Sequence, residues 1–185
     1  MVSSAVYRYV ENRDVLLTRL IVEAYDSLGS AVERATATNA DDTDLERWIA
    51  AGLAARRWAR RRRHEYLLLY GSPVPGYAAP AVTAQPGTRV PRALVAIVRD
   101  ASAAGRLAAT DAPEPTGIAD DLDRLAELVE LPVAHTTLVA VIGGWTQMFG
   151  LISFELTNQT RGVVTDHAGL FLATVQQSGH RIGLR

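Results

Sequence analysis

Apolar residues recur along most of this chain at intervals of three and four, which places side chains on one face of an α-helix. The segments with this spacing or a helical apolar run are about 14–35, 43–63, 64–71, 89–105, 120–130, 133–158 and 165–178. Asn12 or Asp14 can cap the first segment, and Thr43 or Asp44 can cap the second. The abundance of Ala, Leu, Val and Arg also favours helices. We therefore expect an all-α fold.

The segment from Val133 to Asn158 is apolar nearly all round, which predicts a helix buried on both sides. A glycine inside a helix costs about 1 kcal/mol relative to alanine, so the three in this segment need a reason. We expect close approach of a second helix at Gly143, Gly144 and Gly150. On the short acidic helix we expect four side chains to face the interior: Leu122, Leu125, Leu128 and Val129.

Two polar linkers, at about 36–42 and 106–118, interrupt the helical pattern. Prolines and glycines between Pro73 and Pro91 predict a long irregular loop. The glycines of that loop lack phosphate-loop spacing, and no Lys-Ser or Lys-Thr follows them.

Composition narrows the classes of function. Apolar residues are 48% of the chain, enough for a sizeable core, and the net charge of −1 means that any affinity for nucleic acid must be local. Cysteine is absent, which excludes disulfides and thiol catalysis. No signal peptide and no apolar run of about 20 residues is evident. We expect a cytoplasmic protein of one domain, or one domain and a fragment, without a cofactor.

The first residues have the chemistry of a helix laid into a DNA groove. Tyr7, Arg8, Tyr9 and Arg13 bring aromatic and cationic groups into seven positions. Arginine can bind a guanine edge, while arginine and tyrosine hydroxyls can bind phosphates. On spacing alone, two ordinary helices with exposed arginines remain the alternative.

The run Ser-Ser-Ala-Val-Tyr-Arg-Tyr-Val at 3–10, followed by Arg-Asp-Val-Leu-Leu at 13–17, resembles the recognition helix and following helix of TetR/AcrR-family transcriptional regulators. The resemblance implies a TetR-like helical bundle, with residues 1–35 as a remnant of the DNA-binding domain. It implies Ser3, Ser4 and Arg8 at base edges, and Tyr7, Tyr9 and Arg13 on phosphates. A helix-turn-helix has two helices before this one. We therefore expect a misplaced start, a fragment of a longer chain, or a DNA-binding domain that has lost its front.

A second resemblance covers Tyr66 to Pro80 and the stretch from Trp145, both similar to the "WHG" branch of the same regulators. Trp145 and Gly150 match the branch motif Trp-x-x-x-His-Gly, but Phe149 replaces the histidine. The resemblance implies that residues 43–185 form a ligand-binding and dimerisation domain, which pairs through its last two long helices.

Aromatic and soft side chains in that domain suit an apolar ligand. The candidates are Trp58, Tyr66, Tyr70, His135, Trp145, Met148 and Phe149. Any one of them is also compatible with an ordinary place in the core.

Two charged clusters have alternative interpretations. The arginines from Arg56 to Arg63 suit either a solvated helix end or a site for an anion, with the acidic segment 111–130 as a possible partner. The carboxylates of residues 120–130 suit a metal less well than a solvated face, because no ligand spacing accompanies them.

No arrangement of residues predicts catalysis. The four histidines form no i, i+4 pair, and no serine has nucleophile-elbow glycines around it. Of the histidines, only His135 is a candidate for facing a ligand. We expect no catalytic residue and no metal ligand.

The function implied by the resemblance is a DNA-binding, ligand-responsive transcriptional regulator, most often a repressor, that acts on an operator as a homodimer. The alternative is a stand-alone ligand-binding and dimerisation module without DNA binding. An enzyme built on a helical bundle is a third and weaker alternative.

Overall fold

The computed structural model describes residues 12–37 and 42–185, and every regular element in these ranges is helical. The elements are α2 (Arg13–Thr36), α3 (Asp44–Arg61), α4 (Arg63–Tyr70), the 3-10 helix η1 (Ala81–Thr83), α5 (Ala84–Gly87), α6 (Arg89–Ala103), α7 (Ala119–Leu128), α8 (His135–Leu156) and α9 (His167–Ile182). The prediction of an all-α fold is confirmed.

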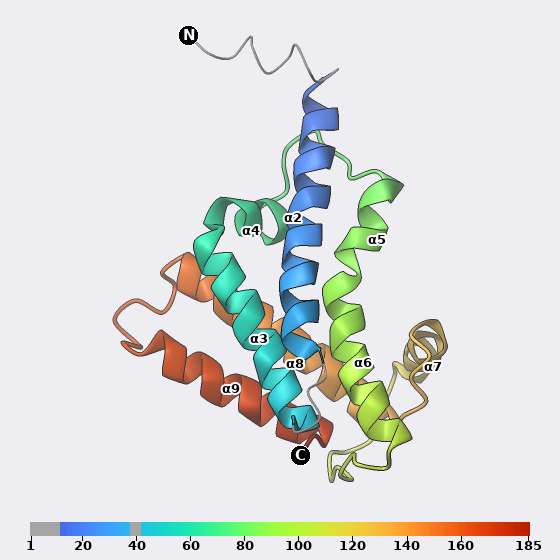
Figure 1. Ribbon diagram of the computed structural model, residues 1–185. Helices are drawn as coiled ribbons and strands as arrows, with labels where there is room; N and C mark the ends of the chain where they lie inside the picture. Colours follow the sequence, from blue (N-terminus) through green and yellow to red (C-terminus); the bar gives the residue numbers. More distant parts are fainter. Residues whose placement is uncertain (1–11, 38–41) are drawn as a thin grey trace.

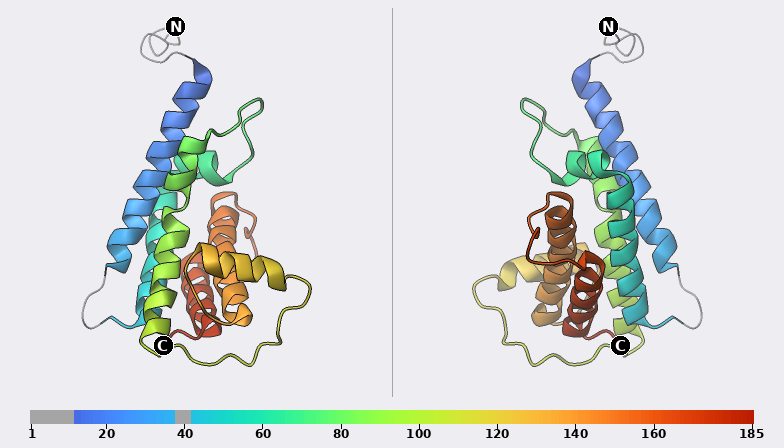
Figure 2. Two further views of the ribbon diagram at one scale, coloured as in Figure 1. Left: turned by 90° about the vertical axis from the view of Figure 1, so that its right-hand side faces the viewer. Right: turned by 90° about the vertical axis from the view of Figure 1, so that its left-hand side faces the viewer.

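The long helices form three layers (Figure 1; Figure 2). Helix α2 is outermost, α3 and α6 lie in the middle, and α8 and α9 lie on the far side. Helix α7 lies beside α8 at the edge of the bundle. The core therefore extends from α2 through the middle layer to α8 and α9.

Side-chain caps define the starts of the first two helices. Asn12 Oδ1 accepts a hydrogen bond from the Val15 amide at 2.9 Å, which starts α2. Thr43 and Glu46 form a reciprocal capping box at the start of α3. The sequence already indicated both positions as caps.

Trp48 of α3 joins three helices. Its side chain is fully buried, and its Nε1–H donates to Ser178 Oγ of α9 at 2.9 Å. An added Cβ at Gly144 would lie 2.7 Å from Trp48 Cζ2, and one at Gly179 would lie 3.2 Å from Trp48 Cδ1. The indole thus needs glycine at position 144, and this explains Gly144 as a site of close helix approach. At Gly179 the nearest atom to an added Cβ is Leu45 Cδ1, at 2.5 Å.

The other two glycines of α8 have a different environment. An added Cβ at Gly143 or at Gly150 would meet no atom within 4 Å. The expectation of close contact at these two positions is wrong within the single chain, because both face outward. On the same helix Val139, Ile142 and Phe154 are also exposed, so α8 is not buried on both sides in one chain as its pattern predicted.

Arg89 of α6 binds α2 at three places. Its guanidinium donates to Asp26 Oδ1 at 2.8 Å, to Ser30 Oγ at 2.9 Å and to Glu33 Oε1 at 2.8 Å. Gly29 makes room for it, because a Cβ there would lie 2.7 Å from Arg89 Cβ. These bonds hold the pKa of Glu33 below its ordinary value. The contact therefore stabilises the fold at neutral pH and weakens as acid protonates Glu33.

Three details differ from the sequence predictions. The irregular loop ends at Pro80 rather than Pro91, because the residues after Pro80 form η1, α5 and α6. Pro91 fits in the first turn of α6, where backbone amides have no partner within the helix. Helix α9 continues past Ser178 to Ile182 and ends at Gly183, whose φ of 97° is left-handed. Leu128 is 81% exposed rather than internal, because it ends α7 and only Leu122 of that helix is buried.

Length and composition alone would let α8 cross a membrane. The core helix of a folded domain has the same properties, and α8 packs against α3, α6, α7 and α9. We therefore interpret α8 as a core helix.

The close contact at Gly144 leads to a prediction. Gly144→Ala should lower the free energy of unfolding by about 1–3 kcal/mol, because the new methyl group overpacks Trp48. Glu23→Ala, at an exposed position of α2 outside the proposed dimer surface, is the control and should change stability by less than about 0.5 kcal/mol. Urea unfolding at one protein concentration measures both; equal losses would contradict the role given to Trp48.

Candidate ligand-binding site

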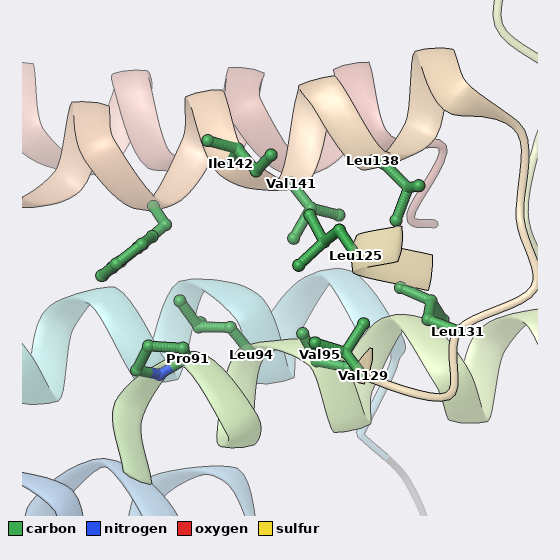
Figure 3. A pocket seen from close by; sticks show the side chains of 10 residues that line it. Pro91, Leu94, Val95, Leu125, Val129, Leu131, Leu138, Val141 and Ile142 are labelled. Atoms are coloured by element: carbon green, nitrogen blue, oxygen red, sulfur yellow. The ribbon is translucent and has the colours of Figure 1, made fainter. Parts of the chain in front are cut away.

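A cavity of about 100 Å³ lies between α6, α7 and α8. All ten residues that line it are apolar or aromatic: Pro91, Leu94, Val95, Leu125, Val129, Leu131, Leu138, Val141, Ile142 and Trp145. Figure 3 shows the side chains of α8 extending toward those of α6. The cavity is therefore suited to an apolar group.

The helical repeat explains two of the walls. Leu138, Val141, Ile142 and Trp145 stand at i, i+3, i+4 and i+7 on α8, and so they share one face. Residues 91, 94 and 95 have the same relation on α6. An apolar face of α6 and an apolar face of α8 thus meet without filling the space between them.

Arg99 of α6 holds the third wall in place. Its guanidinium donates to the carbonyl oxygens of Val129 at 2.5 Å and Glu130 at 3.2 Å. Glu130 has a positive φ of 52°, which turns the chain so that Leu131 is fully buried. The segment after α7 is therefore fixed against α6, and closes the cavity on that side.

Trp145 is the residue with a polar group in this apolar wall. Among the residues that the structure describes, its Nε1 is the one buried side-chain nitrogen or oxygen without a hydrogen-bond partner. The other two tryptophans are paired, Trp48 with Ser178 and Trp58 with Ser27 at 2.9 Å. An unpaired buried donor costs about 1–3 kcal/mol, so its presence needs an explanation.

A chain of aromatic rings leads from Trp145 to α2. Trp145 meets Phe149 edge-on at 6.4 Å between ring centroids, and Phe149 meets Tyr70 of α4 at 4.7 Å. Tyr70 in turn meets Tyr25 of α2 edge-on at 6.3 Å. Tyr66 packs on both Tyr70 and Phe149, at 5.1 and 6.4 Å. The cavity wall and α2 are therefore connected through packed rings.

The tyrosines in this cluster are neutral. The Tyr66 hydroxyl donates to the Phe149 carbonyl oxygen at 2.9 Å and lies 2.8 Å from Ser153 Oγ. Burial raises the pKa of Tyr66 to about 12, and burial also raises the pKa values of Tyr70 and Tyr25. The cluster thus brings no charge to the cavity.

The seven ligand candidates from the sequence divide into two groups. Trp145 lines the cavity, and three others join it in the aromatic cluster: Tyr66, Tyr70 and Phe149. The remaining three lie outside both the cavity lining and the aromatic cluster. Met148 is buried near Gly52, Trp58 is bonded to Ser27, and His135 lies 2.8 Å from Asp123 at the start of α8.

The DNA-binding candidates fall mostly outside the described residues. Ser3, Ser4, Tyr7, Arg8 and Tyr9 lie in the part of the chain that is not described. Arg13 is the first residue of α2, and its side chain is exposed.

The arginine cluster is not simply a solvated helix end. Arg56 is buried and donates to both carboxylate oxygens of Glu155 on α8, each at 2.7 Å. Arg60 also approaches Glu155, at 3.5 Å, and Arg62 binds Glu65. The acidic partner thus comes from α8 rather than from segment 111–130.

Two carboxylates of the acidic helix are also paired. Asp121 binds Arg124 on the same helix, and Asp123 binds His135, which also lies 3.4 Å from Glu114. The two contacts of His135 connect α7 and the preceding linker to the start of α8.

Sequence reasoning missed most of the cavity lining. The residues of α6 and α7 that form it looked like ordinary core positions, for example Leu94, Val95 and Leu125. Their helical spacing was visible, but a void between two apolar faces leaves no mark in a sequence.

Comparison with known proteins finds one family model and several related transcriptional regulators that match most of this chain. A family model described as the tetracyclin repressor-like C-terminal domain matches residues 48–177. The HTH-type transcriptional regulator Rv1816 of Mycobacterium tuberculosis (strain ATCC 25618 / H37Rv) is 39% identical over 164 residues, which cover 86% of this chain and 68% of that protein. The HTH-type transcriptional regulator Mb1846 of Mycobacterium bovis matches with the same values.

Solved structures agree with this result. The crystal structure of a protein described as regulatory, SCO4313, superposes with a TM-score of 0.70 and 30% identity, over 96% of this chain and 79% of that one. A protein from Rhodococcus sp. RHA1 superposes with a TM-score of 0.60 and 21% identity, over 94% and 73% of the two chains. The second likeness concerns the fold alone.

The ion pair between Arg56 and Glu155 gives a second prediction. Glu155→Gln should lower the free energy of unfolding by about 3 kcal/mol, because it leaves a buried guanidinium without a counter-charge. Arg60→Ala is the matched control on the same carboxylate; since Arg60 is 58% exposed, the loss should stay below about 1 kcal/mol. Urea unfolding at low and high salt measures both, and a small loss in Glu155→Gln would show that the pair adds little.

Proposed function

The chain belongs to the TetR family of transcriptional regulators, and from that premise we propose that it is a ligand-responsive repressor that binds operator DNA as a homodimer. The observation that supports the ligand response is the apolar cavity with the aromatic chain that connects it to α2. The family is one of regulators rather than enzymes. We also propose that the protein acts in the cytoplasm, where its operator lies.

We propose that residues 3–13 contact the operator. Ser3, Ser4 and Arg8 would bind base edges, while Tyr7, Tyr9 and Arg13 would bind phosphates. The exposed position of Arg13 at the start of α2 supports this assignment.

We propose that ligand binding in the cavity shifts the position of α2. The cavity is lined by residues of α6 and α8. Arg89 bonds α6 to α2. On α8, the rings of Trp145 and Phe149 connect through Tyr70 to Tyr25 of α2. A ligand can change DNA affinity only by binding one of two conformations more tightly. Half-sites on DNA lie about 34 Å apart, so a small change in the separation of two α2 helices would weaken binding.

We propose that two copies pair through α8 and α9. Outside the cavity wall, these two helices carry exposed apolar residues within one chain: Val139, Phe154, Leu170 and Leu172. Gly143 and Gly150 on α8 leave room for the close approach of another helix. An exposed helix face that combines apolar residues with glycines, as on α8, is typical of an interface between copies.

DNA binding is tested by fluorescence anisotropy of the chain against DNA from its own upstream region, over a salt series. Arg13→Ala should weaken binding to all sequences alike and reduce the salt slope by about 1, because one phosphate contact is lost. Arg161→Ala, in the exposed turn after α8, is the control and should change neither. Absence of selective binding by the unchanged protein would favour the stand-alone ligand-binding and dimerisation module.

The dimer is tested by placing a charge on its proposed surface. Phe154→Glu should convert a dimer into a monomer at micromolar concentration, because the carboxylate would lose its hydration in an apolar interface. Leu128→Glu on α7 is the control; its position is 81% exposed and lies outside the proposed surface. Analytical ultracentrifugation measures the mass, and a dimer that survives Phe154→Glu contradicts the proposed interface.

A further inference from the structure

We propose that Tyr77 positions the N-terminal half of α2 for operator binding, through a hydrogen bond that its hydroxyl donates to Thr18. Tyr77 lies in the loop of residues 71–80, which leads from α4 on one side of α2 to η1 and α5 on the other (Figure 1). This role rests on the proposed function, because the N-terminal end of α2 carries Arg13, a proposed phosphate contact.

The sequence of the loop builds a rigid turn that presents Tyr77. Val74-Pro75-Gly76-Tyr77 has proline at the second position and glycine at the third, which is the pattern of a type II turn. Gly76 has the positive φ that this turn needs, 75°, and the Tyr77 amide donates to the Val74 carbonyl oxygen at 3.1 Å. Pro75 fixes one more backbone angle. The loop itself therefore places the base of the Tyr77 side chain.

The hydrogen bond from the loop to α2 has a defined direction. Thr18 Oγ1 donates to the carbonyl oxygen of Asp14, one turn earlier in the helix, at 2.8 Å. A hydroxyl has one proton to donate, so the tyrosine is the donor in the contact of 2.9 Å between Tyr77 Oη and Thr18 Oγ1. The two bonds thus connect the loop to the first turn of α2, at the residue next to Arg13.

Other elements hold the two halves of α2 unequally. Side chains of α3 and α6 donate hydrogen bonds to its C-terminal half at five residues: Asp26, Ser27, Ser30, Glu33 and Thr36. In the part of α2 before Asp26, Thr18 is the one described residue with a hydrogen bond to another element. A change at Thr18 or Tyr77 therefore has no second hydrogen bond nearby to compensate for it.

Packing between the loop and α2 is incomplete. A groove of about 390 Å³ lies between them, and its lining includes Ile21, Tyr25, Val74 and Tyr77. Unfilled space provides fewer van der Waals contacts, so the hydrogen bond has a large share in fixing α2 against the loop. Tyr25 is also the last ring of the aromatic chain from the cavity. In the proposed ligand response, a shift of those rings would therefore reach the contact between the loop and α2.

The first test is amide hydrogen exchange along α2 in the full chain, followed in ¹H–¹⁵N spectra. In Tyr77→Phe the amides of residues 17–21 should exchange roughly two- to tenfold faster, which is the effect of one net hydrogen bond on a local opening. Those of residues 29–36 should not change, because the bonds from Arg89 and Arg47 remain. Unchanged exchange at residues 17–21, or an equal increase along all of α2, would overturn the proposal.

Tyr25→Phe is the matched control. It removes the same hydroxyl from a ring that lines the same groove, but no described residue is bonded to the Tyr25 hydroxyl. Exchange in α2 should therefore stay as it is in the unchanged protein. An increase as large as in Tyr77→Phe would show that the hydrogen bond to Thr18 is not the cause.

Variants of Thr18 test the other partner of the bond. Thr18→Ser keeps the accepting hydroxyl and should retain slow exchange, whereas Thr18→Val removes it and should speed exchange at residues 17–21. Adding Tyr77→Phe to Thr18→Val should change nothing further, because the bond is already absent. Additive effects of the two changes would contradict the proposed contact.

Operator binding, measured by fluorescence anisotropy, tests the functional part of the role. Tyr77→Phe should weaken selective binding roughly two- to tenfold with an unchanged salt slope, because fewer free molecules hold α2 in the binding position while every phosphate contact remains. Unchanged binding would mean that Tyr77 serves stability alone, and would overturn the role. If the unchanged protein bound no operator, the proposed DNA binding would fail, while the exchange rates would still decide whether Tyr77 positions α2.

Discussion

The arrangement of α3, α8 and α9 depends on one buried indole. Trp48 fills the space where the three helices meet, and it fits because Gly144 has no side chain there. Its hydrogen bond to Ser178 also fixes the direction of the ring. Since α8 carries a wall of the cavity on one face and exposed apolar residues on another, this contact determines how the cavity lies relative to the outer surface of the bundle.

The molecule combines rigid contacts with an incompletely filled space. Arg56 and Glu155 join α3 to α8, and Arg89 joins α6 to α2, each through short charged hydrogen bonds. The cavity lies between α6 and α8, where packing is apolar and unfilled. In the proposed function, a ligand in this cavity would act between two helices that are each bonded to a neighbour, and α2 would move with them.

Much of the fold could be predicted from the sequence, because helical periodicity is a local property. The caps at Asn12 and Thr43 are of this kind. The family was indicated by short local motifs, and the family model matches residues 48–177. Pairings between distant residues could not be predicted. Arg56 and Glu155 are far apart in sequence, and nothing near Arg56 indicates that its partner lies on α8.

The candidate site shows the same limit. Aromatic residues were predicted to contact a ligand; Trp145 lines the cavity, and Phe149, Tyr70 and Tyr66 join it in one cluster of packed rings. Trp58 and His135 looked equally suitable in the sequence, but their polar atoms are bonded to Ser27 and Asp123. Whether a buried polar atom has a partner depends on tertiary packing, and so the unpaired indole of Trp145 was visible only in the structure.

In the proposed ligand response, α2 would tilt about its contact with Arg89 near Gly29. The part of α2 from Gly29 to Arg13 spans 16 residues (29 − 13), or about 24 Å at about 1.5 Å per residue. A tilt of about 5° at this contact therefore moves the far end by about 2 Å, a displacement comparable with a hydrogen-bond length. A small ligand-driven tilt would therefore suffice, in the proposed function, to change the position of the proposed DNA-contacting end of α2.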